Sequence, residues 1–433
     1  MRPVILAISI FSVLSVPVFS AQELSLATAI QEGKLKSPSI LKSTALLREA
    51  SFKKEEILGS GFAPKLSANS SYSLSRKYEV LDIPFNGETV TFPSIYPTTV
   101  YGIKAKLPLF DGFANQAALD SSDLLEQAAQ ENLNLAEFQL EQSIRLAYFH
   151  AFTAQQLLTV TEHHVKVLQD HLKQVQIQKK GGTATAYDEL RIQVQLSEAE
   201  LDAADAKDNV VISHQNLIQL LGIVQDDRRL IDEIPSPDIK RLEQLVFDGT
   251  FKTRSDIQSL RLHCASLEKQ EHEDTPWFVP QIAAVGSADL YNNQNDAIAS
   301  DAFRSAYQTA VVLNWNLFDG NVSKAKSDIA HAQREKIEAD INAAKLNAYG
   351  DFEQMKRKYI SNTRRFEIKN LDTQRSEESV RLARLEARAG SRTNTEVLDA
   401  ELDLFRSKAG SVLAKMNAVE ALINLEITLG RRL

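Results

Sequence analysis

The chain has almost no cysteine, and long stretches of it have no proline. Cys264 is the only cysteine among 433 residues, so no disulfide can form within one chain and stability has to come from burial. All twelve prolines lie before residue 109 or between residues 235 and 280. The tracts 109–234 and 281–433 therefore lack the residue that most strongly interrupts a helix.

Excess positive charge, long apolar runs and catalytic motifs are also lacking. The net charge is −8, or −9 once Arg2 is lost with a signal peptide, which argues against nucleic acid as a partner. Beyond residue 20, no apolar run reaches the eighteen residues of a predicted transmembrane helix. The sequence has no phosphate-binding loop and no catalytic constellation. We therefore predict no enzyme activity and no cofactor, and another protein must supply any energy.

Two neighbouring histidines, His163 and His164, raise the question of a metal site. Adjacent residues on a helix point to different faces, so the two rings cannot jointly hold a metal ion. We therefore predict no metal site and interpret this pair as solvated structural residues.

Residues 1–20 have the pattern of a secretory signal peptide. Arg2 is followed by an apolar run, and Val18 and Ser20 occupy the positions that signal peptidase reads. We expect the mature chain to begin at Ala21. No cysteine follows the apolar run, so we do not expect a lipid anchor.

The stretch 110–182 predicts one very long helix. It contains neither glycine nor proline between Phe113 and Lys180. Apolar or small residues alternate in steps of three and four, which is the seam of a helix packed along its length: Ile144, Ala147, Ala151, Ala154, Leu158, Thr161, Val165, Leu168, Leu172 and Val175. Such a helix would be on the order of 100 Å long. Taken alone, this stretch favours a soluble fibrous coiled coil.

The two proline-poor tracts are copies of each other at a constant offset of 208 residues. The motif Leu-Phe-Asp-Gly at 109–112 recurs at 317–320. Other residues recur at the same offset: Gly182, Thr185, Leu190, Asn216, Leu217, Leu221 and Gly222 correspond to Gly390, Thr393, Leu398, Asn424, Leu425, Leu429 and Gly430. A period this long indicates a duplicated half-molecule rather than a solenoid.

Before each Phe-Asp-Gly, apolar or small residues alternate with polar ones. The alternating sets are Leu66, Ala68, Ser70, Tyr72, Leu74 and Ile103, Ala105, Leu107, Leu109 in the first copy, and Ile282, Ala284, Gly286, Ala288, Leu290 and Thr309, Val311, Leu313, Trp315, Leu317 in the second. This pattern predicts strands long enough to cross a bilayer when tilted. We expect loops at Asp82–Pro97 and Tyr291–Arg304 to join each pair.

Four strands per chain are too few for a membrane barrel, since the smallest single-chain barrels have about eight. An open sheet edge in lipid leaves backbone groups unpaired at several kcal/mol each. If the strands cross a membrane, several chains must therefore share one barrel. For each pair taken alone, a half-buried soluble hairpin is the favoured interpretation. The export signal, and the lack of a second sheet for a sandwich, favour the membrane.

Shorter elements surround these parts. We predict helices at Ser25–Glu32, at Ser37–Leu58 and at Ser255–Glu271, the second with Ser37 as N-cap and Pro38 at its first position. We predict that Asp111 and Asp319 are the N-caps of the long helices. We also predict that Ile231–Phe247 links the two copies and contributes to a belt around the rod.

These features together resemble the TolC-like outer-membrane efflux and secretion proteins over nearly the whole mature chain. The resemblance rests on the duplicated order of short helix, strand pair, long helix, glycine turn and shorter helix. It also rests on Leu-Phe-Asp-Gly at both strand-to-helix junctions and on the turn sequences 182–190 and 390–400. It implies a homotrimer in outer-membrane lipid, a periplasmic adaptor protein and an inner-membrane RND or ABC transporter.

The resemblance thus implies a fold class that is mainly α with a small β part. A duplicated half-molecule would supply a long α-helical barrel and two membrane β-hairpins per chain, which a trimer completes as a twelve-stranded β-barrel. The predicted divisions are a signal peptide at 1–20, N-terminal helices at 21–65, a first β-hairpin at 66–109, a first long-helix pair at 110–230, a linker at 231–253, a short helix at 254–280, a second β-hairpin at 281–317 and a second long-helix pair at 318–433.

The resemblance also assigns roles to residues at the two helical turns. The turns at Gly181, Gly182 and Thr183 and at Gly390 and Ser391 would lie at the far periplasmic end and dock the adaptor. Glycine there also supplies the backbone freedom of a tight helix reversal.

Just after the second turn, Glu396 and Asp399 lie three residues apart on one predicted helix face. In TolC-like proteins the acids at these positions point into a narrowed periplasmic mouth. Three chains would then crowd six carboxylates together, which should raise some of their pKa values and favour cations. Arg392 and Asp188 match the family's positions for a salt bridge that holds the mouth shut, although the assisting tyrosine of the family is replaced by Ala387.

The sequence therefore predicts a passive outer-membrane duct that extends into the periplasm of a Gram-negative bacterium. It would belong to a tripartite efflux pump or a type I secretion system. The alternative is a structural or adhesive coiled-coil protein of the periplasm or cell surface. The two predictions differ over whether the strands form a pore.

Overall fold

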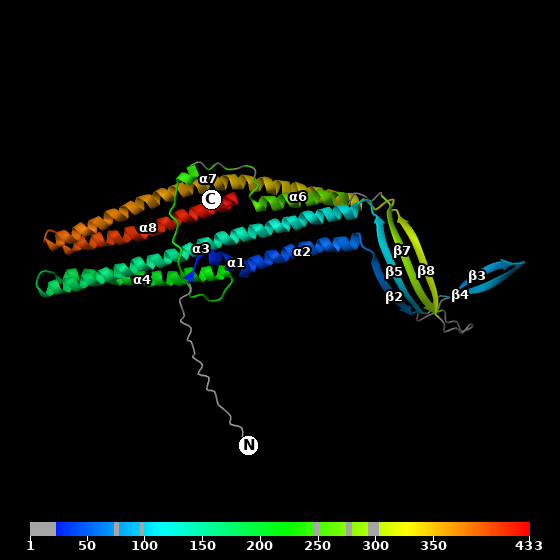
Figure 1. Ribbon diagram of the computed structural model, residues 1–433, viewed down its shortest axis with the longest axis horizontal. Helices are drawn as coiled ribbons and strands as arrows, with labels where there is room; N and C mark the ends of the chain where they lie inside the picture. The colour runs from blue at the N-terminus through cyan, green and yellow to red at the C-terminus, as the bar shows by residue number, and fades with distance from the viewer. Residues whose placement is uncertain are drawn as a thin grey trace, which may run out of the picture.

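A computed structural model describes residues 23–72, 78–95, 99–243, 245, 247, 249, 251–273, 279–292 and 303–433. The predicted signal peptide lies outside these residues. The molecule is elongated, with paired helices along most of its length and a twisted sheet at one end (Figure 1).

Two helical hairpins form the rod. In the first, α3 (Ala114–Lys180) is followed by α4 (Ala186–Leu221); in the second, α7 (Val322–Arg388) is followed by α8 (Asn394–Leu429). Both long helices have 67 residues, or about 100 Å, and both shorter ones have 36. The predicted long helix and duplication are confirmed. None of the described helices is both long and apolar enough to cross a membrane.

The predicted short helices are also present, with longer bounds than the sequence indicated. They are α1 (Leu26–Lys36), α2 (Pro38–Gly61) and α6 (Ser255–Glu273). Beyond the end of α4, α2 continues along α3, and α6 likewise accompanies α7 beyond the end of α8 (Figure 1). Each long helix therefore has a short partner over most of its length.

The end of α4 is packed tightly against the start of α2, and the end of α8 is packed in the same way against the start of α6. Gly222 and Gly430 end these helices with φ of 71° and 66°. A Cβ on Gly222 would stand 2.6 Å from the carbonyl oxygen of Lys36, and one on Gly430 would stand 2.7 Å from that of Thr253. Both the backbone conformation and the close approach require glycine.

A belt crosses the middle of the rod. In it, β1 (Glu23–Leu24) pairs in parallel with β6 (Arg229–Leu230), and the short helix α5 (Lys240–Glu243) follows. The Tyr148 hydroxyl of α3 donates to the Leu24 carbonyl at 2.8 Å and accepts the amides of residues 231 and 232 at 3.0 Å. One buried tyrosine thus fastens two distant segments to the long helix.

The main hydrophobic core lies at the same level as the belt. Its buried members come from α1, α2, α3, α4, α8 and the belt: Leu24, Ala29, Ile40, Leu140, Ile144, Tyr148, Phe149, Ala151, Leu217, Leu221, Leu230, Ile234, Met416, Val419 and Ile423. Smaller clusters continue toward the turns. The middle of the rod is therefore its best-packed part.

At the end of the rod opposite the turns, four strands form an antiparallel sheet in the order β2-β5-β7-β8. They are β2 (Lys65–Tyr72), β5 (Thr99–Phe110), β7 (Gln281–Asn292) and β8 (Arg304–Asn314). The two predicted strand pairs join edge to edge through β5 and β7. The last strand ends at Asn314, three residues before the predicted Leu317.

The faces of this sheet differ sharply. Register and strand alternation place every charged residue of the four strands on one face: Lys65, Lys104, Lys106, Asp289 and Arg304. We call this the polar face. The opposite, apolar face has no charged residue and carries Leu66, Tyr101, Ile103, Leu107, Leu290, Tyr307, Val311 and Leu313.

The predicted loop Asp82–Pro97 is wrong over most of its length. It forms a second hairpin from β3 (Tyr78–Phe85) and β4 (Glu88–Ile95) that is not paired with the four-stranded sheet. Asn86 and Gly87 make its two-residue turn with φ of 57° and 89°, the conformation that Asn-Gly favours. Residues 293–302 of the other predicted loop lie outside the described residues.

The predicted N-caps of the long helices are shifted by two residues. Phe113 and Asn321 occupy the cap positions, both in the left-handed region. The carboxylate of Asp111 still accepts the backbone amide of Asn115 at 2.7 Å, and that of Asp319 accepts the amide of residue 323 at 2.8 Å. Both aspartates therefore satisfy a helix terminus from outside the cap position.

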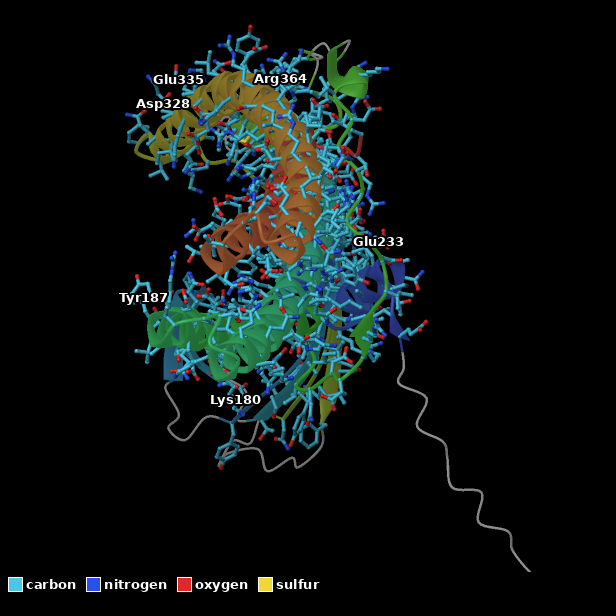
Figure 2. All side chains as sticks on the ribbon, turned by 90° about the vertical axis from the view of Figure 1, so that its left-hand side faces the viewer. Lys180, Tyr187, Glu233, Asp328, Glu335 and Arg364 are labelled. Atoms are coloured by element: carbon cyan, nitrogen blue, oxygen red, sulfur yellow. The ribbon has the colours of Figure 1, made fainter. Side chains whose placement is uncertain are left out.

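Viewed from the turn end, the helices of one chain follow an arc that is open on one side (Figure 2). Lys180 and Tyr187 of the first hairpin lie toward one end of the arc, and Asp328 and Glu335 of α7 lie toward the other. A single chain is thus a curved wall.

The close junctions at Gly222 and Gly430 give the first prediction. Gly222→Ala and Gly430→Ala should each destabilise the protein by about 1–3 kcal/mol, because a left-handed alanine is strained and its Cβ meets a carbonyl. Gly59→Ala in α2, where none of the described atoms lies within 4 Å of the new Cβ, should instead be neutral or stabilising by up to about 1 kcal/mol. Thermal unfolding followed by circular dichroism in detergent measures all three; unchanged melting at both junctions would contradict the packing argument.

Candidate functional site

The two helical turns have the same backbone structure. Gly182 and Gly390 both have φ of 77°, and no atom of the described residues lies within 4 Å of a Cβ built on either. The Thr183 amide donates to the Gln178 carbonyl at 2.9 Å, and the Ser391 amide donates to the carbonyl of residue 386 at 3.0 Å. The turns are therefore ordered but sterically open, so glycine is needed for its backbone conformation alone.

Each turn is followed by a capping box. Thr185 and Asp188 form the first, and Thr393 and Glu396 form the second, with backbone amide to carboxylate distances of 2.9 Å in both. Hydrogen bonds from the Thr185 hydroxyl and amide lower the pKa of Asp188, and those from the Thr393 amide and hydroxyl lower the pKa of Glu396. Within one chain, the predicted gate acid Glu396 thus stabilises the start of its own helix.

Glu396 and Asp399, which the sequence placed on one helix face, have different partners. Asp399 pairs with Arg191 of α4, with 3.2 Å between the guanidinium and carboxylate atoms. Residues 191 and 399 are separated by the repeat offset of 208, so the bridge joins equivalent positions of the two copies. Arg191 was not predicted as a site residue from the sequence, although the constant offset aligns it with Asp399.

The proposed link between Arg392 and Asp188 is not formed within a single chain. Arg392 instead pairs with Glu386 across its own turn at 2.6 Å. A different contact joins the turn ends of the two helical hairpins, which we call the tips. In it, the Asn394 side-chain amide donates to the side-chain oxygen of Gln178 at 2.8 Å.

Between belt and tips, α3 of the first copy packs against α8 of the second; we call this contact the seam. Near the belt, the almost fully buried Glu426 pairs with Arg145. Farther along, the His164 ring stacks on Phe405 with centroids 4.3 Å apart and an angle of 9° between planes. His164 is buried, so its interpretation as a solvated residue is wrong; His163, beside it, is exposed.

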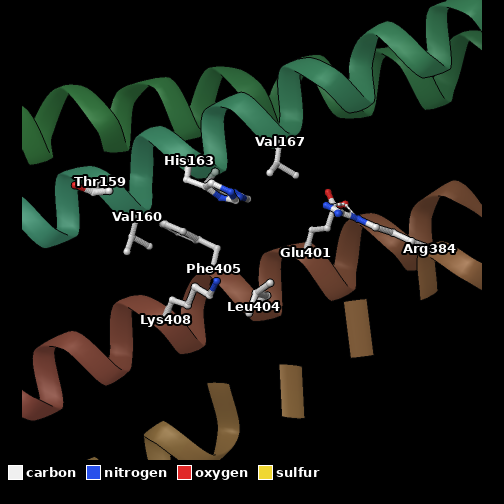
Figure 3. A pocket seen from close by; sticks show the side chains of 10 residues that line it. Thr159, Val160, His163, Val167, Arg384, Glu401, Leu404, Phe405 and Lys408 are labelled. Carbon is white, nitrogen blue, oxygen red and sulfur yellow. Dashed lines mark hydrogen bonds and ion pairs between the residues drawn. The ribbon is translucent and has the colours of Figure 1, made fainter. Parts of the chain in front are cut away.

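A cavity of about 240 Å³ opens at this part of the seam (Figure 3). Glu401 of α8 and Arg384 of α7 line it, with guanidinium to carboxylate distances of 2.9 and 3.0 Å. The neighbouring His171 is buried on α3. Neither His171 Nε2 nor the second carboxylate oxygen of Glu401 has a hydrogen-bond partner among the described residues.

Burial decides the charge state of both seam histidines. It lowers the pKa of His164, with Asp202 opposing and His163 adding to the shift. Burial likewise lowers the pKa of His171, opposed by Glu401 and reinforced by Arg384. The packed seam therefore favours neutral rings. Over the part of the chain that the structure describes, no group of three His, Cys, Asp or Glu side chains could hold a metal ion.

Comparisons with known proteins agree on one architecture. A family model described as outer membrane efflux protein matches residues 29–223 and 250–431. A search of curated protein sequences found no match. Among solved structures, the chain is similar to CusC, described as forming a transmembrane channel, with 16% identity, a TM-score of 0.76 and coverage of 94% of this chain and 92% of that one.

Two further solved structures are similar over comparable lengths. The outer membrane protein VceC of Vibrio cholerae has 17% identity and a TM-score of 0.74, with coverage of 94% of this chain and 96% of that one. The outer-membrane channel OprN has 17% identity and a TM-score of 0.72, with coverage of 94% and 89%. At these identities the solved structures establish the fold.

The buried histidines give the second prediction. Because their pKa values are lowered in the packed seam, the unfolded chain binds more protons as pH falls below the ordinary histidine value of about 6.5. The stability contributed at the seam should be complete above that pH and lost below it. The free energy of unfolding, measured between about pH 8 and pH 5.5, should therefore depend less on pH in a variant carrying His164→Phe and His171→Gln than in the parent chain.

The matched control for this experiment is His150→Gln, because His150 is exposed on the same helix. It should retain the pH dependence of the parent chain. A seam variant with the parent's full pH dependence would show that other groups are responsible.

Proposed function

The chain belongs to the outer membrane efflux protein family, and we propose that three copies of it form one continuous duct from the outer membrane across the periplasm. As a member of this family, it is an outer-membrane efflux channel with a fold of channel proteins. Such channels are trimeric and work with adaptors and inner-membrane pumps. The number of copies, the partners and the gate of this particular chain are the proposal.

The observation that carries the proposal is the sheet with two different faces and two open edges. In a bilayer, the apolar face meets lipid and the polar face meets water. Among the described strands, β2 and β8 each have only one neighbour, and their outer backbone groups need partners. Because β2 leads away from the helices and β8 returns to them, β8 of one chain can pair antiparallel with β2 of the neighbouring chain. Three copies give twelve strands in one closed barrel.

The helical part supports the same assembly. One chain forms a curved wall with an open side (Figure 2), and further copies would complete its circumference. The helices follow directly from the strands, so the inside of the barrel continues into the inside of the rod. The strands then lie in the outer membrane, and the open turns at Gly182 and Gly390 lie deepest in the periplasm.

We propose these turns as the surface that docks a periplasmic adaptor and, through it, an RND or ABC transporter. Their glycines have free space on the Cβ side, so an approaching helical hairpin could come close to the backbone. The adjacent residues Gly181, Thr183 and Ser391 would share this surface. The duct itself is passive, and the pump supplies the energy.

The acids beyond the second turn are proposed as the periplasmic gate. The bridge from Arg191 to Asp399 ties the two copies within one chain, and Arg392 and Asp188 would tie neighbouring chains if Arg392 exchanged Glu386 for Asp188. Both candidate bridges are exposed, and such pairs contribute only about 0–1 kcal/mol each. A gate closed by weak pairs can be opened by the binding of an adaptor.

The third prediction tests the assembly. In mild detergent the protein should form one species at three times the chain mass, since only a closed barrel pairs both sheet edges. The same species in planar bilayers should give discrete conductance steps. A stable monomer without conductance would instead favour the coiled-coil alternative.

The fourth prediction tests the gate. Glu396→Gln together with Asp399→Asn should lower cation selectivity and weaken block by divalent cations, because carboxylates at the mouth are removed. Arg392→Ser should raise conductance. The control exchanges the acids, Glu396→Asp with Asp399→Glu, which keeps the charge; aspartate already caps the matching helix at Asp188. Equal cation selectivity in the parent, the neutralised double variant and the exchange control would show that these carboxylates do not line the pore.

A further inference from the structure

Three lysines form a cluster on the polar face, at the end of the sheet nearest the helices. Lys65 begins β2 and is directly opposite Lys106 of β5. Lys104 lies two residues from Lys106 on the same strand and therefore on the same face. All three side chains are exposed.

This arrangement is unfavourable for the sheet itself. Like charges directly opposite each other on neighbouring strands are destabilising, and Cβ atoms of such pairs are only about 5 Å apart. Among the described residues, no carboxylate lies within ion-pair distance of Lys65, Lys104 or Lys106. Asp289, the only acid on the polar face, is opposite Gly102 and leans over it toward Asn69.

Assembly does not supply the missing carboxylate from a neighbouring strand. In the trimer, the free edge next to Lys65 would pair with β8 of a neighbouring chain, and β8 (Arg304–Asn314) contains no aspartate or glutamate. This holds whichever register joins the two strands. The lysines therefore stay uncompensated by the strands on either side.

We propose that Lys65, Lys104 and Lys106 form an anion-binding ring inside the barrel, where the duct passes from the sheet to the helices. This inference rests on the proposed trimer, in which the polar face lines the pore and three copies bring nine ammonium groups to one level. Their field attracts anions and repels cations in the pore. The basic ring and the acids at Glu396 and Asp399 occupy opposite ends of the helical duct.

The chemistry of the ring fits solutes with phosphate, carboxylate or sulfonate groups. Lysine offers a compact charge on a flexible stem, so it attracts anions without demanding one geometry. Neighbouring strands add Ser67, Ser287 and Gln281 to the polar face, which can form weak hydrogen bonds with a passing anion. Weak, multiple contacts favour passage over tight binding.

Ion selectivity of the reconstituted trimer tests the ring, with inorganic phosphate as the probe. Lys65→Gln, Lys104→Gln and Lys106→Gln combined should shift the reversal potential in a KCl gradient toward that of potassium. Added phosphate should reduce the current through the parent channel and lose this effect in the triple variant. The matched control replaces the same three lysines by arginine, which keeps the charge and should keep both properties.

The outcomes separate this inference from the proposed function. Triple-variant channels with the parent's selectivity and phosphate sensitivity would overturn the ring but leave the duct intact. A parent chain that forms no channels would overturn the duct and the ring with it. Repeating the test in neutral and in anionic lipid identifies the source of the phosphate group: a charge effect seen only in anionic bilayers would place the lysines at lipid headgroups and overturn a luminal ring.

Discussion

Unpaired backbone groups along the two edges of a four-stranded sheet are the constraint on which the rest of this molecule depends. A sheet with one uncharged face is suited to lipid, and lipid offers no hydrogen bonds to an open edge. Among the described residues, the sheet of a single chain has four strands, which are too few to close a membrane barrel. In the proposed trimer, neighbouring chains therefore meet edge to edge, and that pairing would arrange the attached helices around a common axis.

Much of the fold could be predicted because it is encoded locally. A helix of 67 residues needs a stretch without proline, and the offset of 208 shows that the same design occurs twice. The extra hairpin was missed although Asn86-Gly87 is a strong local turn signal, because prolines and polar residues around it favoured a loop. Strand order depends on pairing between residues far apart in the chain, such as β5 with β7, and periodicity alone does not specify it.

The site was less predictable, because partners across the seam depend on how each helix is rotated. Helical spacing placed Glu396 and Asp399 on one face but could not show that one caps its helix and the other pairs with Arg191. The capping boxes were readable as Thr-x-x-Asp and Thr-x-x-Glu. The burial of His164 could not be predicted from the sequence, because it depends on contact with Phe405 from the second half of the same chain.

The belt also sets the mechanics of the rod. Tyr148 holds α3 at the level of the main core, and Lys180 ends the same helix 32 residues later. A stiff helix fixed at one point behaves as a lever, so a tilt of about 5° at the belt displaces the tip roughly 50 Å away by about 4 Å. Side chains near the belt can therefore stay packed while the turns move by more than the length of a hydrogen bond. In the proposed duct, a small rotation of the helices at the belt would therefore become a large change in the width of the periplasmic mouth.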